Sequence, residues 1–299
     1  MIKLVNDIKK ANCITHSGTM HADEVFATAF LHLYKGDLNV YRVSEVDLSK
    51  VMDNTLVYDI GRCKFDHHQE DAEVRENGIK YSSIGLLWKK FGKEYLKKNK
   101  VDNIDEVFKG IDKELIESLD AIDNGIFPEI EANYKVKTLS DVIKLFNPSS
   151  FTNEDESTQF LKAESFAKEI FIETLYNVIG KIKSKEIVNS IIEKNEGPIL
   201  ELEEYLPYEE AILTNEKGKE LLFVIYPSNR GGYAIKTLPK SIEDKTDRLL
   251  LPKEWAGLSN EELENVTKVE GALFCHTNRF IATASTKEAI KSLAKKALE

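Results

Sequence analysis

The sequence has only three cysteines and no apolar stretch long enough to cross a membrane. Cys13, Cys63 and Cys275 lie far apart, which argues against a disulfide framework and indicates a reducing compartment. No run approaches the roughly 20 apolar residues that a membrane-spanning helix needs. The first 12 residues lack both the apolar core of a signal peptide and the Arg and Ser content of a transit peptide. These absences predict a cytoplasmic protein with no membrane partner.

Positive charge is also in deficit. The 299 residues carry 41 Lys+Arg against 51 Asp+Glu, a net charge of −10 at pH 7, and only six are arginine. A field of this sign repels polyanions, so tight binding of a long duplex is not expected. The lysine-rich stretch 89–100 could follow a nucleic-acid backbone. A solvated helix face is the more frequent reason for such a run, and a short single strand entering by one end fits the charge better than a duplex.

The first half of the chain alternates short apolar runs with amphipathic ones. Strands are predicted at 12–15, 40–43 and 56–60, and helices from Ala22 to a C-terminal Gly36, at 84–96 and at 107–122. This alternation predicts the α/β class, with a mostly parallel sheet flanked by helices. Ligands of such sheets bind where the strands end and the loops to the helices begin.

The second half begins with helical periodicity and ends in strands. Apolar spacing over 157–194 predicts helices with a break near Gly180, because one helix of that length would span roughly 55 Å. Strands are predicted at 221–226, 232–238, 271–275 and 280–283, and a closing helix at 287–298. We expect a catalytic metal-binding domain over 1–150. A helical connector and a smaller α+β substrate-binding domain would occupy 151–299, and the connector could cover a hinge or form a homodimer surface.

Five of the six histidines lie within the first 68 residues. Four of these five fall among His and Asp clusters at predicted ends of strands or helices: His16–Glu24, Asp59–Gly61, Phe65–Gln69 and Asp120–Gly125. Each cluster alone has an ordinary explanation, since Asp23 suits a helix N-terminus and Asp59 suits a turn. Asp120 and Asp123 end a helix, where acids oppose the helix dipole and call for a nearby cation. His32 is expected to be an ordinary helix residue.

Together the four clusters predict a metal centre. Imidazole and carboxylate ligands without paired cysteines favour Mn²⁺, and less strongly Mg²⁺, Co²⁺ or Zn²⁺. The clusters offer more ligands than one ion uses, so we expect two ions that share an aspartate. A hydroxide bridging the two ions would then attack a phosphorus centre.

These motifs resemble a known group of enzymes. Asp66-His67-His68, with Asp59-Ile60-Gly61 before it and Asp120 to Gly125 after it, resembles the DHH phosphoesterase superfamily. More narrowly, Thr15 to Glu24, Phe65 to Gln69 and Arg230-Gly231-Gly232-Tyr233 are similar to the family of the melanocyte-proliferating-gene exonuclease. The resemblance covers nearly the whole chain. It implies a DHH-type metal domain followed by a smaller substrate-binding domain.

The resemblance also implies roles for individual residues. The first metal would be held by His16 and His21, with Asp59 bridging. The second would be held by Asp23, Asp59, His67 and Asp123, with Asp120 as the competing ligand at the last position. His68 would touch the scissile phosphate and help to protonate the leaving group, and Asp66 would orient His67 or His68.

The second half offers candidate phosphate ligands. Arg230 directly precedes Gly231 and Gly232, and Arg279 follows shortly after His276. An arginine fork beside glycine backbone suits a phosphate or a nucleotide end, although a solvated arginine in a turn is the ordinary alternative.

The chain is therefore expected to be a two-metal phosphoesterase that acts as an exonuclease on RNA or short oligonucleotides. A phosphatase or pyrophosphatase for small phosphorylated metabolites is the alternative within the same chemistry. A zinc deacetylase is disfavoured, because the His-x-x-His that it needs is missing from the sequence. A non-catalytic metal-binding scaffold would lack a ligand or a phosphate-binding residue, and no such gap is visible.

Overall fold

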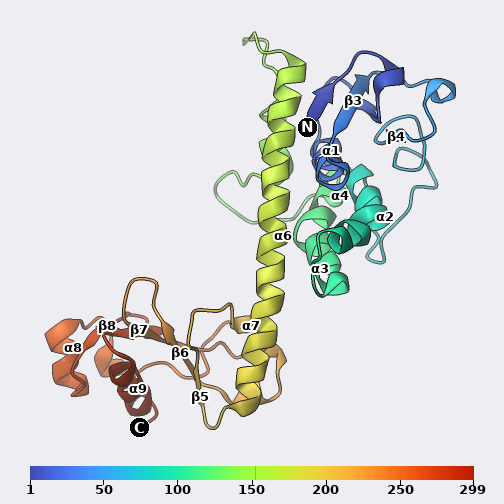
Figure 1. The fold of residues 1–299 in the computed structure, drawn as a ribbon. Coiled ribbons are helices and arrows are strands. Elements are labelled where there is room, and N and C mark those ends of the chain that lie inside the picture. Colours follow the sequence, from blue (N-terminus) through green and yellow to red (C-terminus); the bar gives the residue numbers. More distant parts are fainter. Residues whose placement is uncertain (152) are drawn as a thin grey trace. The chain divides into compact units, whose positions relative to one another are not determined.

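The computed structural model describes residues 1–151 and 153–299. They form two compact units, Met1–Ile179 and Gly180–Glu299, each with a sheet and helices (Figure 1). The predicted α/β class, with a parallel sheet in the first part and a mixed α+β second part, is confirmed.

The sheet of the first unit is parallel throughout. Its described strands are β1 (Ile2–Leu4), β2 (Cys13–His16), β3 (Leu38–Val43) and β4 (Leu56–Val57), in the order β1-β3-β2-β4. The strand predicted at 56–60 ends early, because Asp59 has a φ of 55° and so leaves the extended conformation. Strand β1 was not predicted, since three residues are too few to establish a period.

Helices cover this sheet and form a shared core. They are α1 (Ala22–Lys35), α2 (Ser83–Lys98), α3 (Ile104–Ile111), α4 (Glu117–Asp123) and α5 (Leu139–Lys144), with a π-helical stretch at Asp112–Ile116. Every residue of α1 from Ala22 to Leu31 is buried. The rings of Phe30, Trp88 and Phe171 lie 5.3–5.6 Å apart at the centre of this core. Burying each such side chain contributes about 1.5–3 kcal/mol, which fixes α1 firmly in the unit.

Helix α6 (Glu156–Lys194) is continuous, so the predicted break near Gly180 is wrong. One glycine in a helix costs about 1 kcal/mol relative to alanine, which is too little to end a helix that packs along its length. The two units divide inside α6, between Ile179 and Gly180. Phe160 and Phe171 of α6 are buried in the first unit. His32 is more than an ordinary helix residue, since its Nδ1 lies 2.7 Å from the buried carboxylate of Glu164 on α6.

The second unit contains a mixed sheet covered on both faces. Its described strands are β5 (Ile199–Glu201), β6 (Phe223–Pro227), β7 (Tyr233–Thr237), β8 (Ala272–Cys275) and β9 (Ile281–Ala284), in the order β5-β6-β7-β9-β8. Its helices are α7 (Glu209–Thr214), α8 (Asn260–Thr267) and α9 (Lys287–Lys296). Alternate residues of β6 face opposite layers: Phe223 packs with Ile290 and Leu293 of α9, and Val224 packs with Val188 and Ile192 of α6.

Candidate metal centre

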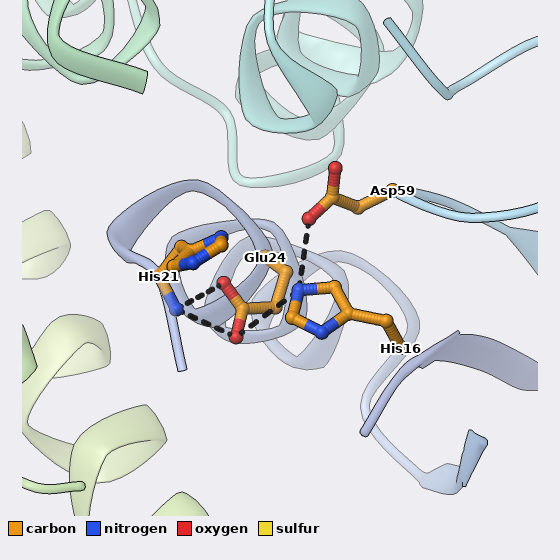
Figure 2. A group of neighbouring side chains, drawn as sticks. All are labelled: His16, His21, Glu24 and Asp59. Atoms are coloured by element: carbon orange, nitrogen blue, oxygen red, sulfur yellow. Dashed lines mark hydrogen bonds and ion pairs between the residues drawn. The ribbon is translucent and has the colours of Figure 1, made fainter. Parts of the chain in front are cut away.

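The first candidate ligands come from the end of β2 and the loop between β2 and α1, at the carboxyl end of a central strand. His16 is the last residue of β2, and His21 directly precedes α1. The carboxylate of Glu24 accepts the backbone N–H of His21 through both oxygens at 2.9 Å and lies 3.6 Å from His16 Nε2. The imidazole of His16 points toward Asp59, and Nε2 lies 3.1 Å from Asp59 Oδ2 (Figure 2). Residues from two separate strand ends therefore meet at one point.

A tight loop after β4 supplies Asp59 and the histidine pair. Asp59 takes the left-handed conformation, which aspartate tolerates better than most residues. Its N–H donates to the carbonyl of Phe65 at 3.0 Å, which closes the loop. Gly61 has a φ of 84°, and a Cβ there would lie 2.8 Å from a methyl of Val46. This closure brings Asp59 beside His67, with 3.4 Å between Oδ1 and Nδ1.

Asp123 at the end of α4 completes the cluster. Its Oδ2 lies 2.7 Å from His67 Nε2. Burial opposes the protonation of His67, but the hydrogen bond to Asp123 and the charges of Asp123 and Asp59 raise its pKa. Burial also disfavours the Asp123 anion, but the bond to His67, the charges of His67 and His21 and a hydrogen bond with Asp23 together lower the Asp123 pKa. The Asp123 carboxylate opposes the dipole of α4, and the His67 imidazole, when protonated, supplies the positive partner that this placement needs.

The geometry and the unpaired atoms of the cluster fit divalent ions. Three groups have potential ligand atoms within 4.8 Å of one another: His16, His21, Glu24 and Asp59; Asp59, Asp66, His67 and His68; and His21, Asp23 and Asp123. Among the described residues, four buried atoms here have no hydrogen-bond partner: His16 Nε2, Asp23 Oδ1, Asp59 Oδ1 and His67 Nδ1. His16 Nε2 and His67 Nδ1 still lie 3.1 and 3.4 Å from oxygens of Asp59. A buried polar atom without a hydrogen bond costs about 1–3 kcal/mol, and coordination of a metal would remove that cost.

The electrostatics of the cluster also call for cations. Burial first, and then the charges of Asp59, Asp123 and Glu24, raise the pKa of Asp23 well above its usual value. Burial likewise raises the pKa of Glu24 to about 8. Burial opposes the protonation of His16, but Asp59 and Glu24 raise its pKa to about 9. Buried like charges are costly, and divalent ions would neutralise them.

His68 lies beside this cluster with one ring nitrogen held by Asp66. His68 Nδ1 donates to Asp66 Oδ1 at 2.6 Å, and the same oxygen accepts the backbone N–H of His68 at 3.1 Å. The other oxygen accepts the backbone N–H of Arg62 at 2.6 Å. Burial disfavours the Asp66 anion, but these bonds outweigh burial and lower its pKa. The His68 side chain is 59% exposed, so its Nε2 is accessible to a substrate.

Asp120 is not brought into the cluster. It is fully buried and accepts hydrogen bonds from Arg75 Nη2 at 2.6 Å and from Ser82 Oγ at 2.7 Å. The next residue, Ser83, donates to Asp23 Oδ2 at 2.8 Å. Asp120 thus holds the start of α2, and α2 in turn orients Asp23. Asp123 is the residue of this pair that faces His67.

Glu24 was not predicted as a ligand, and Arg75, Ser82 and Ser83 were not predicted as supporting residues. The signal for Glu24 was present, because it stands one residue after Asp23 in the motif. Glutamate in the first turn of a helix usually satisfies backbone N–H groups, and Glu24 does so while also facing His16. The other contacts cross about 40–60 residues of sequence and leave no local pattern.

The residues predicted to bind substrate occupy two different ends of the second sheet. Arg230, Gly231 and Gly232 lie in the turn from β6 to β7, and His276 and Arg279 lie in the turn from β8 to β9. Strands β7 and β9 are antiparallel, with Tyr233 opposite Ala284 and Lys236 opposite Ile281. The first turn therefore borders the end of β9, and the second borders the end of β7. The five residues cannot surround one phosphate group within this sheet.

Several of these residues have structural partners. Gly232 approaches the backbone closely, since a Cβ there would lie 2.3 Å from the carbonyl oxygen of Ala284. Arg279 Nη1 donates to the carbonyl of Leu251 at 3.2 Å, and the His276 ring packs on Phe280 with 4.4 Å between centroids. Arg230 and Gly231 are exposed at the tip of their turn. Arg230 is therefore the arginine of the two turns that is better placed to meet an anion.

The family of the chain follows from comparison with known proteins. The family model MYG1_exonuc, described as an uncharacterised protein family (UPF0160), matches residues 12–298. The chain belongs to the MYG1 family. The match includes every residue of the metal cluster and both turns of the second sheet.

Individual relatives in the MYG1 family match over almost the full chain. The MYG1 protein of Saccharomyces cerevisiae is 30% identical and covers 99% of this chain and 98% of its own length. The MYG1 protein of Dictyostelium discoideum is 29% identical, with 95% of each chain covered. The human protein named MYG1 exonuclease is 29% identical and covers 95% of this chain and 85% of its own length.

The likeness to a solved structure is weaker. The structure of a pGpG-specific phosphodiesterase from Vibrio covers 97% of each chain at 12% identity, but its TM-score of 0.31 is too low to support a statement about this chain. Over residues 1–151 and 153–299, no helix is both long and apolar enough to cross a bilayer.

Proposed function

We propose that this chain is a two-metal-dependent phosphoesterase of the DHH superfamily, and that it acts as an exonuclease on RNA or short oligonucleotides. The observation that carries the proposal is the set of three overlapping ligand groups, in which buried ligand atoms have no hydrogen-bond partner; two of the groups share Asp59 and two share His21. Membership of the MYG1 family, which includes proteins named MYG1 exonuclease, supports the same activity.

The proposed ligand sets combine residues of the three groups: Asp59 and His67 share one group, and Asp23 and Asp123 share another with His21. His16, His21 and Asp59 would hold the first ion, and the position of Glu24 makes it a further ligand of that ion. Asp23, Asp59, His67 and Asp123 would hold the second. Imidazole and carboxylate donors with no thiolate favour Mn²⁺ over softer ions, and Mg²⁺, Co²⁺ and Zn²⁺ are the alternatives. When bound, two divalent ions polarise a phosphoryl oxygen and lower the pKa of a water molecule.

The side chains beside the ligands would complete the chemistry. Asp66 fixes the proton on His68 Nδ1, so Nε2 is the ring atom that meets the substrate. A protonated His68 Nε2 can donate to a phosphoryl oxygen and then to the leaving oxygen. Ser83 would orient Asp23 by donating to its Oδ2, which leaves Oδ1 without a hydrogen-bond partner.

The second unit would bind the rest of the substrate. Arg230 lies exposed beside two glycines of positive φ, a setting in which a guanidinium and backbone can approach a phosphate closely. Net charge favours a short strand over a long duplex, because a chain of −10 repels an extended polyanion. The same charge is compatible with a phosphatase or pyrophosphatase for small phosphorylated metabolites.

One experiment separates these substrates. The purified chain is incubated with Mn²⁺ and end-labelled short RNA, end-labelled short DNA, pyrophosphate or a generic aryl phosphodiester, beside Asp59→Ala. Stepwise shortening of RNA that is lost in Asp59→Ala is the expected result. Release of phosphate from pyrophosphate alone would replace the exonuclease by the alternative. Equal behaviour of the wild type and Asp59→Ala on every substrate would refute a catalytic role for this centre.

A further inference from the structure

An arginine and a glutamate form hydrogen bonds with the backbone of His16 and Gly18, where β2 passes into the loop before α1. Arg42 lies on β3, and Glu156 is the first residue of α6. Arg42 Nε donates to the carbonyl of His16 at 3.1 Å, and Nη2 donates to the carbonyl of Gly18 at 3.3 Å. The third guanidinium nitrogen, Nη1, donates to Glu156 Oε1 at 2.7 Å.

Glu156 also contacts the loop directly. The same Oε1 accepts the backbone N–H of Gly18 at 2.9 Å. The carboxylate and the guanidinium together therefore satisfy an N–H group and two carbonyl groups of His16–Gly18. Bonds to charged partners are stronger than neutral ones, typically contributing about 1.5–3 kcal/mol.

The arginine is itself fixed by packing. Its side chain is only 6% exposed, and its guanidinium carbon lies 4.2 Å from the centre of the buried Phe160 ring. A planar guanidinium stacked on an aromatic ring has few other positions to adopt. Arg42 therefore presents its donors to the loop from a fixed place.

The loop depends on these contacts because it has little packing of its own. Gly18 and Thr19 are exposed, and Gly18 has a φ of 91°. The far end of the loop is held separately, where Asn147 bonds both the N–H of Met20 at 2.6 Å and its carbonyl at 3.0 Å. Besides the backbone bond from the Ser17 N–H to the carbonyl of Val43 at 3.0 Å, the Arg42–Glu156 pair is the side-chain support nearest to His16, the ligand of the first group on the β2 side of the loop.

We propose that Arg42 and Glu156 are positioning residues for the first metal, holding His16 at the place where its Nε2 meets Asp59 and Glu24. The inference rests on the proposed two-metal site. It predicts that the first ion is affected more than the second. His67 and Asp123 of the second site come from other segments, and Asp23 lies on α1, beyond the point where Asn147 holds Met20. In the described structure no hydrogen bond joins these three side chains to the Arg42–Glu156 pair.

The test measures the number of Mn²⁺ ions bound per chain as a function of the free Mn²⁺ concentration, by equilibrium dialysis of the full chain. Glu156→Ala removes the acceptor for both Gly18 and Arg42. We expect the first ion to bind about 10–100-fold more weakly, the usual effect of losing an outer-shell partner, and the second to change less than about twofold. Glu156→Gln keeps an oxygen at Oε1 and should bind both ions nearly as the wild type does. Arg42→Met should repeat the selective loss.

The matched control is Asp155→Asn. This substitution removes the same charge one residue earlier, while asparagine still accepts the N–H of Thr158 that Asp155 accepts at 2.9 Å. Unchanged binding of both ions in Glu156→Ala, with only a lower Tm, would overturn the positioning role while leaving the metal site intact. Equal weakening of both ions would overturn it as well. A wild type that binds no Mn²⁺ would instead refute the metal site itself.

Discussion

Asp120 and Asp123 lie three residues apart at the end of α4 and face different partners. Asp120 Oδ2 accepts from Arg75 Nη2 at 2.6 Å, while Asp123 Oδ2 lies 2.7 Å from His67 Nε2. Burial raises the Asp120 pKa to about 6 even against the arginine. The two acids are therefore expected to respond to mutation in separate ways.

Asp120→Ala should destabilise the protein without removing an ion. The change leaves the Arg75 guanidinium and Ser82 with one partner fewer in the core, a loss of about 3 kcal/mol. Asp123→Ala should cost less stability and lower the Mn²⁺ stoichiometry by one. Urea denaturation and metal analysis of both variants provide the comparison. A lower metal content in folded Asp120→Ala would show that Asp120 takes part in binding after all.

Asp66→Asn should lower kcat while leaving the bound metal unchanged. The substitution weakens the bond that holds His68 Nδ1, so the ring loses its fixed proton position, and general acid catalysis of this kind contributes about 10²–10⁴-fold. We expect a loss of at least about tenfold, with KM and Mn²⁺ content near wild type. Asp71→Asn, an exposed acid in the same segment, is the control. Additive losses in an Asp66→Asn, His68→Ala double variant would mean that the two residues act independently.

Asp23→Asn should stabilise the metal-free protein and reduce its stabilisation by Mn²⁺, because the second ion loses a ligand. Asp23 is fully buried near Asp59, Asp123 and Glu24, so removing its charge relieves repulsion, and asparagine can still accept the bond from Ser83. Relief of about 1 kcal/mol would raise Tm by about 2–4 °C in a chain of this size. Thermal unfolding in EDTA and in Mn²⁺ measures both effects. A lower Tm in EDTA would contradict the electrostatic reading.

The stability of the metal-free chain should fall as pH rises from about 5 to 9. The folded pKa of Glu24, about 8, lies above its ordinary 4.5, and that of His16, about 9, lies above its ordinary 6.5. The folded state therefore holds both protons more tightly than the unfolded state, and this stabilisation is lost between each ordinary pKa and the folded one. Metal binding needs the deprotonated ligands, so the gain in Tm from Mn²⁺ should grow over the same range. A metal-free Tm that rises between pH 6 and 8 would contradict these shifts.

Arg230→Ala and Arg279→Ala should separate binding from stability. Arg230 is exposed, and its loss should raise KM for an oligonucleotide several-fold while leaving hydrolysis of a small aryl phosphodiester unchanged. Arg279 bonds the carbonyl of Leu251, so its loss should lower Tm and leave KM near wild type. Steady-state kinetics on the oligonucleotide and on the aryl phosphodiester measures KM for both variants, and thermal unfolding measures their Tm. If KM rose only in Arg279→Ala, the turn from β8 to β9 would be the one that binds substrate, and the turn from β6 to β7 would not.

Local pattern was sufficient for much of the fold and for the ligand types. The continuous apolar runs of β2 and β6 reflect strands buried on both faces, and the helical period of α2 reflects one face buried in the core. Both kinds of pattern are visible in the sequence. His16, Asp59, His67 and Asp123 were recognisable because each stands at the end of a predicted element. The chemistry of imidazole and carboxylate donors is likewise a property of the residues themselves.

Tertiary structure decided the rest, because those outcomes depend on contacts between distant segments. Helix α6 continues through Gly180 since packing outweighs a propensity cost of about 1 kcal/mol. Asp120 differs from Asp123 only because Arg75 and Ser82 reach it from elsewhere in the chain. The antiparallel register of β7 and β9 separates two turns that the sequence had grouped together. The sequence by itself determined which ligands the chain offers, and the packing of α1, α4 and the loop after β4 determined which of them meet.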